Sequence, residues 1–164
     1  MDLRTTRTIR SAIEIRAPLD LVWRVLSDFD AYTAWNPHIR RVVGQARVGR
    51  RIGIHTRPPG GRTVVMRPIV LVWAPPHELR WRATFVSRAL FSGEHGFRLE
   101  ELAPGRVRFA QDETFSGWLV PLYARLRLAS TRLGFAQMND ALRTRAETEA
   151  ANEMAPAAAA GATS

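Results

Sequence analysis

The last third of the chain carries one long helical pattern, which begins where a series of strand patterns ends. Between Leu122 and about Glu149 there is no proline, and Gly134 is the only glycine. Arginines occupy much of one side, and Pro121 suits the first helical turn. Apolar residues recur at roughly helical spacing: Leu122, Leu126, Ala129, Leu133, Ala136, Met138, Ala141 and Leu142. A helix of that length spans about 40 Å and must bury its apolar stripe on another element.

Strand patterns separated by short turns fill most of the chain before this helix. The first, Thr8 to Arg16, alternates apolar and polar residues. Pro68 interrupts the fourth, which predicts a bulge or an edge position there. The six later segments are 39–46, 51–57, 62–73, 78–85, 91–102 and 106–115. Consecutive strands with short connections favour an antiparallel sheet.

Two short helical segments, 19–26 and 29–35, fit between the first and second strands. This order predicts an α+β fold: a seven-stranded curved antiparallel sheet wrapped around the long C-terminal helix. One helix cannot fill the whole concave side of such a sheet, so the remaining volume is a candidate pocket. Bulky side chains would be the alternative filling: Trp81, Phe97, Phe109 and Phe115.

The length of 164 residues allows one domain, which we place at 1–150, followed by an Ala-rich tail at 151–164 that we expect to be disordered. The chain has no cysteine, so disulfides and thiolate chemistry are excluded. No apolar run reaches the ~20 residues of a membrane span, and the N-terminus has no apolar signal region. We therefore expect a cytoplasmic protein without an integral membrane segment.

The formal net charge is +9, and all 24 basic residues are arginine. This bias is typical of a GC-rich genome, and the arginines are scattered along the chain instead of forming one stripe. We interpret them as a solvated surface and expect no nucleic-acid partner; an acidic partner is the alternative.

Several segments resemble the START-like (SRPBCC) superfamily, which has the helix-grip fold and includes the birch-pollen allergen family and polyketide cyclase/dehydrase-like and lipid-transport proteins. The likeness spans about Thr8 to Glu149. The segments that carry it are 13–23 (IEIRAPLDLVW), 28–37 (DFDAYTAWNP), 75–81 (PPHELRW) and 93–100 (GEHGFRLE). The resemblance implies the fold predicted above and a pocket for a hydrophobic ligand, but members bind or transform many unrelated ligands.

The last predicted hairpin offers one candidate site for proton transfer. With Pro104 at the centre of the turn, His95 faces Glu113 on the same inward side as Phe97, Leu99 and Phe109. Such a pair transfers a proton or holds a ligand hydroxyl, and the carboxylate would raise the imidazole pKa. A structural His–Glu pair is the alternative.

The remaining candidates are ligand-contacting residues. They are Trp35, Trp81, Phe97, Phe109, Gln111, Phe115, Leu126 and Leu133. The four histidines fall in separate elements, so we predict no metal site, and without a nucleotide-binding motif we predict no cofactor.

Three functions stay open. The first is a binding protein for a hydrophobic small molecule such as a lipid, polyketide or aromatic compound. The second is a polyketide cyclase/dehydratase-like enzyme that uses His95 and Glu113 for proton transfer. The third is a regulatory domain that binds a protein partner. The sequence leaves ligand, pathway and oligomeric state open.

Overall fold

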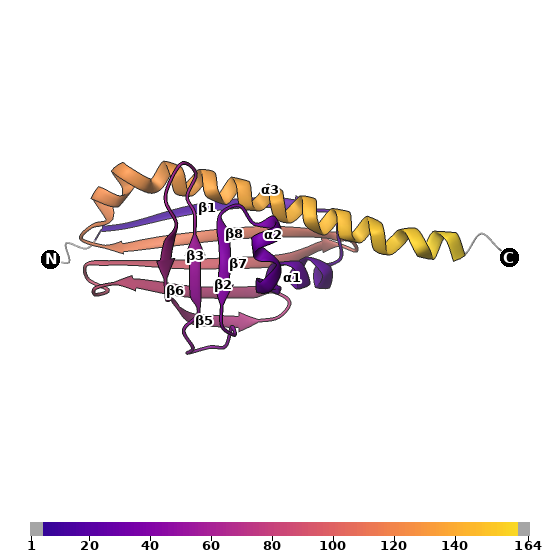
Figure 1. The fold of residues 1–164 in the computed structure, drawn as a ribbon, viewed down its shortest axis with the longest axis horizontal. Helices are drawn as coiled ribbons and strands as arrows, with labels where there is room; N and C mark the ends of the chain where they lie inside the picture. Colours follow the sequence, from indigo (N-terminus) through magenta and orange to yellow (C-terminus); the bar gives the residue numbers. More distant parts are fainter. Residues whose placement is uncertain (1–4, 161–164) are drawn as a thin grey trace.

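A computed structural model describes residues 5–160, with side chains described as far as Ala155. Figure 1 shows long strands lying under one long helix. The elements in chain order are β1 (Thr5–Ile15), α1 (Leu19–Ser27), the 3-10 helix η1 (Phe29–Ala31), α2 (Tyr32–Trp35), β2 (Ile39–Val43), β3 (Gly53–Thr56), β4 (Val64–Met66), β5 (Ile69–Ala74), β6 (Glu78–Phe85), β7 (Phe91–Ala103), β8 (Arg106–Gly117) and α3 (Val120–Ala160).

The strands form two antiparallel sheets, one in the order β1-β8-β7-β6-β5 and one in the order β2-β3-β4. They are linked where Val70 N–H donates to the carbonyl of Arg50 (2.9 Å) and Ile52 N–H donates to the carbonyl of Pro68 (3.1 Å). The α+β helix-grip prediction is confirmed, but the count of seven strands is wrong. Pro68 has no N–H to donate and divides the predicted segment 62–73 into β4 and β5.

The two short helices close one end of the space between sheet and α3. Pro18 directly precedes α1, and the Pro18 carbonyl accepts a hydrogen bond from Val22 N–H at 3.1 Å. After α2, the buried Asn36 side chain accepts hydrogen bonds from the backbone N–H groups of His38 and Ile39, at 3.0 and 2.8 Å. These two hydrogen bonds stabilise the turn that connects α2 to β2.

Helix α3 is longer than predicted and buries a different face. It has 41 residues, about 60 Å, and its end projects beyond the strands in Figure 1. The expected tail 151–164 is helical as far as Ala160, and 161–164 lie outside the described residues. The face towards the sheet is Thr131, Phe135, Met138, Leu142, Ala146 and Ala150.

The stripe predicted from the leucines is therefore wrong in its first half. Leu122, Leu126 and Leu133 are 54, 64 and 51% exposed. Met138 and Leu142, which also belonged to the predicted stripe, are fully buried. Periodicity shows that a side of a helix is apolar, but not that the sheet lies on that side.

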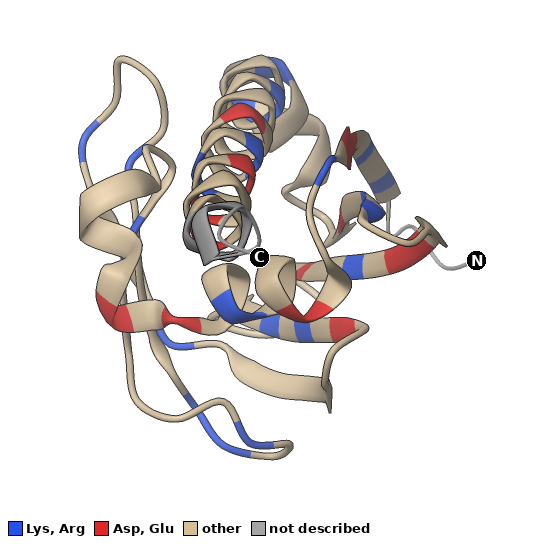
Figure 2. Cartoon of the chain, turned by 90° about the vertical axis from the view of Figure 1, so that its right-hand side faces the viewer, with Lys and Arg blue, Asp and Glu red and all other residues tan. Residues whose placement is uncertain are grey.

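The buried residues form two apolar clusters. The larger joins α1, the inner sides of β6, β7 and β8, and the second half of α3. The smaller contains Ile9, Phe115, Val120 and Phe135. Figure 2, which looks nearly along α3, shows the rest of the chain curving around the helix, with basic residues spread over strands, loops and α3.

Candidate functional site

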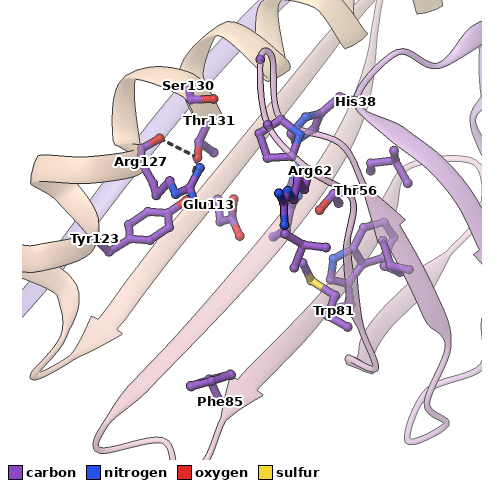
Figure 3. Close-up of a pocket in the computed structure, with 18 residues that line it drawn as sticks. His38, Thr56, Arg62, Trp81, Phe85, Glu113, Tyr123, Arg127, Ser130 and Thr131 are labelled. Atoms are coloured by element: carbon purple, nitrogen blue, oxygen red, sulfur yellow. Dashed lines mark hydrogen bonds between the residues drawn. The ribbon is translucent and has the colours of Figure 1, made fainter.

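A cavity of about 830 Å³ lies between the sheets and the first half of α3. Figure 3 shows its walls. Strands β3, β4 and β6 supply Ile54, Thr56, Met66 and Trp81, and the β3–β4 loop supplies Arg62. The remaining lining carries polar side chains: His38, His95, Glu113, Tyr123, Arg127, Ser130 and Thr131. The space left by one helix on a curved sheet is thus lined by both apolar and polar side chains.

The predicted register of the last hairpin is confirmed. His95 pairs with Glu113, Phe97 with Gln111, and Leu99 with Phe109. Both His95 and Glu113 line the cavity, as their inward parity indicates. The backbone pairing, however, does not decide which side chains bond to each other.

His95 bonds to Gln111 instead of Glu113. The Nε2 group of Gln111 donates to the carbonyl oxygen of Phe135 (3.1 Å) and to Asn139 Oδ1 (2.6 Å). Because a carbonyl oxygen only accepts, the Oε1 of Gln111 must face His95 Nε2, which lies 3.1 Å away. Neutral His95 therefore carries its proton on Nε2. Asn139 Nδ2 in turn donates to Ser11 Oγ at 2.7 Å, so the chain of hydrogen bonds connects β7, β8, α3 and β1.

Burial, with a smaller contribution from nearby His38, lowers the pKa of His95 to about 3. The ring stacks on Phe135 with centroids 4.7 Å apart and lies beside Trp81. The expectation that Glu113 raises this pKa is wrong, because the loss of hydration outweighs the hydrogen bond to Gln111. At pH 7 His95 is a neutral hydrogen-bonding group and a weak base.

Glu113 is the group at the cavity wall that titrates near neutrality. Burial, followed by the neighbouring carboxylate of Asp112, raises the pKa of Glu113 to about 8. Its acid form therefore predominates at pH 7. A protonated carboxyl group donates one hydrogen bond and can release a proton to a bound molecule.

The α3 wall places a hydroxyl pair beside Glu113 (Figure 3). The Thr131 hydroxyl donates to the carbonyl oxygen of Arg127 at 3.1 Å, so the Tyr123 hydroxyl, 2.6 Å away, is the donor to Thr131. Burial and the nearby Glu113 raise the pKa of Tyr123 to about 12. This wall is uncharged at pH 7 except for the arginine.

His38 reaches the cavity because α3 has a glycine where it crosses the ring. A Cβ at Gly134 would lie 2.3 Å from His38 Nδ1, which no real contact allows. Burial lowers the pKa of His38 to about 4, and its buried Nδ1 has no hydrogen-bond partner among the described residues. The close crossing of helix and turn thus depends on Gly134.

The structure brings together only part of the predicted ligand-contacting set. Trp81 lines the cavity. Phe97, Phe109 and Phe115 are fully or almost fully buried in the two clusters and do not line it. Gln111 is also buried, and it acts through its hydrogen bonds to His95 and α3. These residues support the cavity instead of facing it.

Three predicted contacts lie elsewhere. Leu126 and Leu133 point away from the sheet and are exposed. Trp35 packs against Tyr32 with ring centroids 5.0 Å apart and lines a surface groove beside the second half of α3. None of the three lines the cavity, and for the two leucines the reason is that the stripe of α3 facing inward is the one that contains Thr131 and Phe135.

Sequence reasoning missed the α3 wall. Tyr123, Arg127, Ser130 and Thr131 lie outside the predicted leucine stripe, so that pattern does not mark them as cavity residues. A signal was present in Gly134, since a helix-interior glycine indicates a close approach of another segment. Within the described residues, no group of three or more histidine, cysteine, aspartate or glutamate side chains converges.

A family model described as polyketide cyclase / dehydrase and lipid transport matches residues 6–147. The chain belongs to this family. The match spans the sheet, the short helices and most of α3. A search among curated protein sequences gave no match. None of the helices within the described range is long and apolar enough to cross a membrane.

Solved structures share the fold. An aromatase/cyclase named Zhui from Streptomyces sp. R1128 matches with a TM-score of 0.71 and 20% identity, over 87% of this chain and 94% of that one. A START superfamily protein from Mycobacterium smegmatis gives 0.67 and 19%, over 86% and 97%. Norcoclaurine synthase from Thalictrum flavum, in complex with dopamine and hydroxybenzaldehyde, gives 0.64 and 13%, over 86% of both chains. At these identities the likeness is one of fold, and the START-like resemblance is confirmed.

Proposed function

We propose that this protein binds a hydrophobic small molecule, such as a lipid, polyketide or aromatic compound, in the cavity between the sheets and α3. The cavity itself carries the proposal. Its volume of about 830 Å³ lies within the range of about 300–1,000 Å³ typical of ligand pockets. The family, whose description includes both cyclases and lipid transport, supports the same class of function.

The two kinds of lining residue suggest how a ligand would be oriented. Ile54, Met66 and Trp81 offer apolar surface, and burying apolar ligand area there contributes about 25 cal/mol per Å². Glu113 and Tyr123 belong to the polar part of the lining. A ligand with an oxygen-bearing end would place that end against Glu113, whose acid form donates a hydrogen bond.

A fluorescent fatty acid, cis-parinaric acid, tests the proposal by titration into the purified protein. Thr56 lines the cavity, and in the variant Thr56→Trp the larger side chain should fill part of it and weaken binding at least about tenfold. His55 precedes it on β3 and points to the other face of the sheet. His55→Trp is the matched control and should bind like the parent.

Equal binding by Thr56→Trp and the parent, with both folded, would place the probe outside the cavity and contradict the proposal. Native mass spectrometry of the purified protein adds an independent measurement, because a retained natural ligand appears as an added mass that Thr56→Trp should lose.

A proton-transfer enzyme of the cyclase/dehydratase kind is the second candidate, and the raised pKa of Glu113 favours it. In a β-hydroxy carbonyl substrate, the Glu113 acid would give its proton to the departing hydroxyl, which leaves as water. The carboxylate formed would then accept the proton from the carbon next to the carbonyl, as the C=C bond forms. His95, already donating to Gln111, would hold the substrate and not move the proton.

Loss of water from a β-hydroxyacyl thioester, followed by mass spectrometry, tests this candidate. Glu113→Gln keeps the shape of the side chain and should lower turnover by about 10²–10⁴-fold while retaining cis-parinaric acid binding. Turnover that persists in Glu113→Gln would rule out this role for Glu113, and a parent protein without turnover that still binds the probe favours the binding function.

A further inference from the structure

An apolar stripe runs along the solvent-facing side of the first half of α3. Leu122, Leu126 and Leu133 are 54, 64 and 51% exposed. Spacings of four and seven residues place them on one side of the helix, and Ala129 and Ala136 occupy the same side. We call these five residues the outer stripe. It lies opposite the side that packs on the sheet.

The connection between β6 and β7 extends this apolar surface. Its residues Ala89 and Leu90 accept backbone hydrogen bonds from Trp118 and Leu119, both at 3.1 Å, so it lies directly beside the start of α3. Trp118 is 64% exposed, and Val86 at the tip of the hairpin is 83% exposed. Two segments far apart in the sequence thus present large apolar side chains at the same end of the molecule.

Val86 is held in an unfavourable backbone conformation. Its φ of 62° lies in the left-handed region, which a β-branched residue rarely adopts. The neighbouring Phe85 is also exposed, at 66%. Strain that keeps apolar side chains at an exposed hairpin tip suggests a role for them outside the core.

The charged residues of the first half of α3 are all basic. No aspartate or glutamate occurs between Glu113 and Asp140. Arg125 and Arg132 are exposed on α3 at the edge of the outer stripe, and Arg88 belongs to the β6–β7 connection. Within the described residues none of these three arginines forms an ion pair. The surface is both apolar and basic.

We propose that the outer stripe, together with Trp118 and the hairpin tip of Phe85 and Val86, docks on a membrane surface that contains anionic phospholipid. A basic helix face with exposed leucines lies in the interface between headgroups and acyl chains, and tryptophan favours the same depth. Docking does not require a spanning helix. A second copy of the chain fits less well, because pairing two outer stripes would bring Arg125 and Arg132 of each copy together.

The surface adjoins the cavity. Phe85 belongs both to the hairpin tip and to the cavity lining, and Arg127 and Ser130 line the cavity from the same turns of α3 that carry the outer stripe. A hydrophobic molecule would have a short path between the membrane and the cavity. Docking itself does not depend on the proposed ligand binding, since it involves other side chains.

Co-sedimentation of the full chain with lipid vesicles tests the proposal. We expect binding to vesicles of phosphatidylcholine with phosphatidylglycerol, weak binding to phosphatidylcholine alone, and a decrease with added salt. Leu122→Asp/Leu126→Asp should lower the partition coefficient at least about tenfold. Arg125→Gln/Arg132→Gln keeps the leucines and should lower it by about fivefold per arginine.

Leu102→Asp is the matched control. Leu102 is 42% exposed and lies at the end of β7 that is far from the outer stripe, so this variant should bind vesicles like the parent. Circular dichroism checks that each variant is folded. A parent protein that does not bind the anionic vesicles, or an unchanged partition in Leu122→Asp/Leu126→Asp, overturns the proposal. A dimer in light scattering that this double variant converts to a monomer would assign the stripe to a second copy instead.

Discussion

Along α3 the space between helix and sheet is filled at one end and open at the other. At the filled end, Phe97 and Leu99 of β7 and Phe109 of β8 belong to one buried cluster with Leu142 of α3 and Leu26 of α1. The rings of Phe97 and Phe109 stack with centroids 6.1 Å apart. Three layers of secondary structure supply large buried side chains there.

Towards the open end the same strands carry smaller or polar residues on the same inward side, before Phe115 of the smaller cluster. Gly93 and His95 precede Phe97 on β7, and Glu113 follows on β8. On α3, Thr131 and Gly134 face this region. The comparison shows that the cavity arises from a change in side-chain size along continuous elements, combined with the position of α1 at the filled end only.

The largest loss of stability should come from removing a large side chain at the filled end. Phe97→Ala removes a fully buried ring and should lower the free energy of unfolding by about 3–5 kcal/mol. Met66→Ala, at the partly exposed cavity wall, should cost only about 1 kcal/mol. Urea unfolding measures both. Similar losses in the two variants would show that the ends are packed alike.

Adding one methyl group at Gly134, where α3 crosses the turn that carries His38, should change the stability of the protein. Alanine normally stabilises a helix interior relative to glycine by about 1 kcal/mol. Gly134→Ala should instead destabilise the protein by about 2 kcal/mol, because the new Cβ overlaps the His38 ring.

The double variant His38→Ala/Gly134→Ala serves as the control. Because it lacks the His38 ring, its loss in free energy of unfolding should be smaller than the sum of the losses in the two single variants. A thermal melt in which Gly134→Ala alone is more stable than the parent would contradict the close approach.

The polar part of the cavity lining should make stability fall as the pH rises. The pKa of Glu113 is about 8 in the folded chain and 4.5 as the ordinary value, so between these values the folded state binds more protons than the unfolded state. Stability from this group is present below pH 4.5 and is lost as pH rises through 8. Glu113→Gln should thus match the parent near pH 5 and exceed it by about 4 kcal/mol at pH 9, since each pKa unit of difference corresponds to about 1.4 kcal/mol.

Urea unfolding at the two pH values gives this difference directly. An advantage of Glu113→Gln that is the same at pH 5 and pH 9 would mean that the carboxyl titrates normally.

The smallest change is expected at the buried histidines. Burial lowers the pKa of His95 to about 3 and of His38 to about 4, from 6.5. Both should remain neutral at pH 5, and ¹⁵N chemical shifts should show the proton of His95 on Nε2. Their contribution to stability is present above pH 6.5 and is lost as pH falls towards the folded values. A protonated His95 at pH 5 would contradict the lowered pKa, and a neutral ring with its proton on Nδ1 would contradict the hydrogen bond to Gln111.

Much of the strand architecture could be predicted from local patterns. The turn at Pro104 and the alternation of apolar residues gave the pairing of His95 with Glu113, since an antiparallel hairpin has a strict period of two. The split at Pro68 was visible as an interruption, but the sequence pattern did not show that it ends one strand and begins another.

The candidate site was only partly predictable. Parity placed His95 and Glu113 inward, but the partner of His95 depends on Gln111, which is held by a carbonyl of α3. Helix α3 has two apolar stripes, and the one that contains Leu122, Leu126 and Leu133 faces solvent. No local pattern tells which stripe meets the sheet.

By itself the sequence determined the type and order of the elements, the register of the last hairpin and the family resemblance, because each depends on backbone geometry over a few residues. Only the tertiary structure decided which face of α3 is buried, where the open volume lies and which groups titrate near neutrality. These depend on contacts such as that of Asn139 with Ser11, between residues far apart in the chain. Hydration and hydrogen bonding of a side chain are set by such distant neighbours, so a pKa or a cavity cannot be derived from local periodicity.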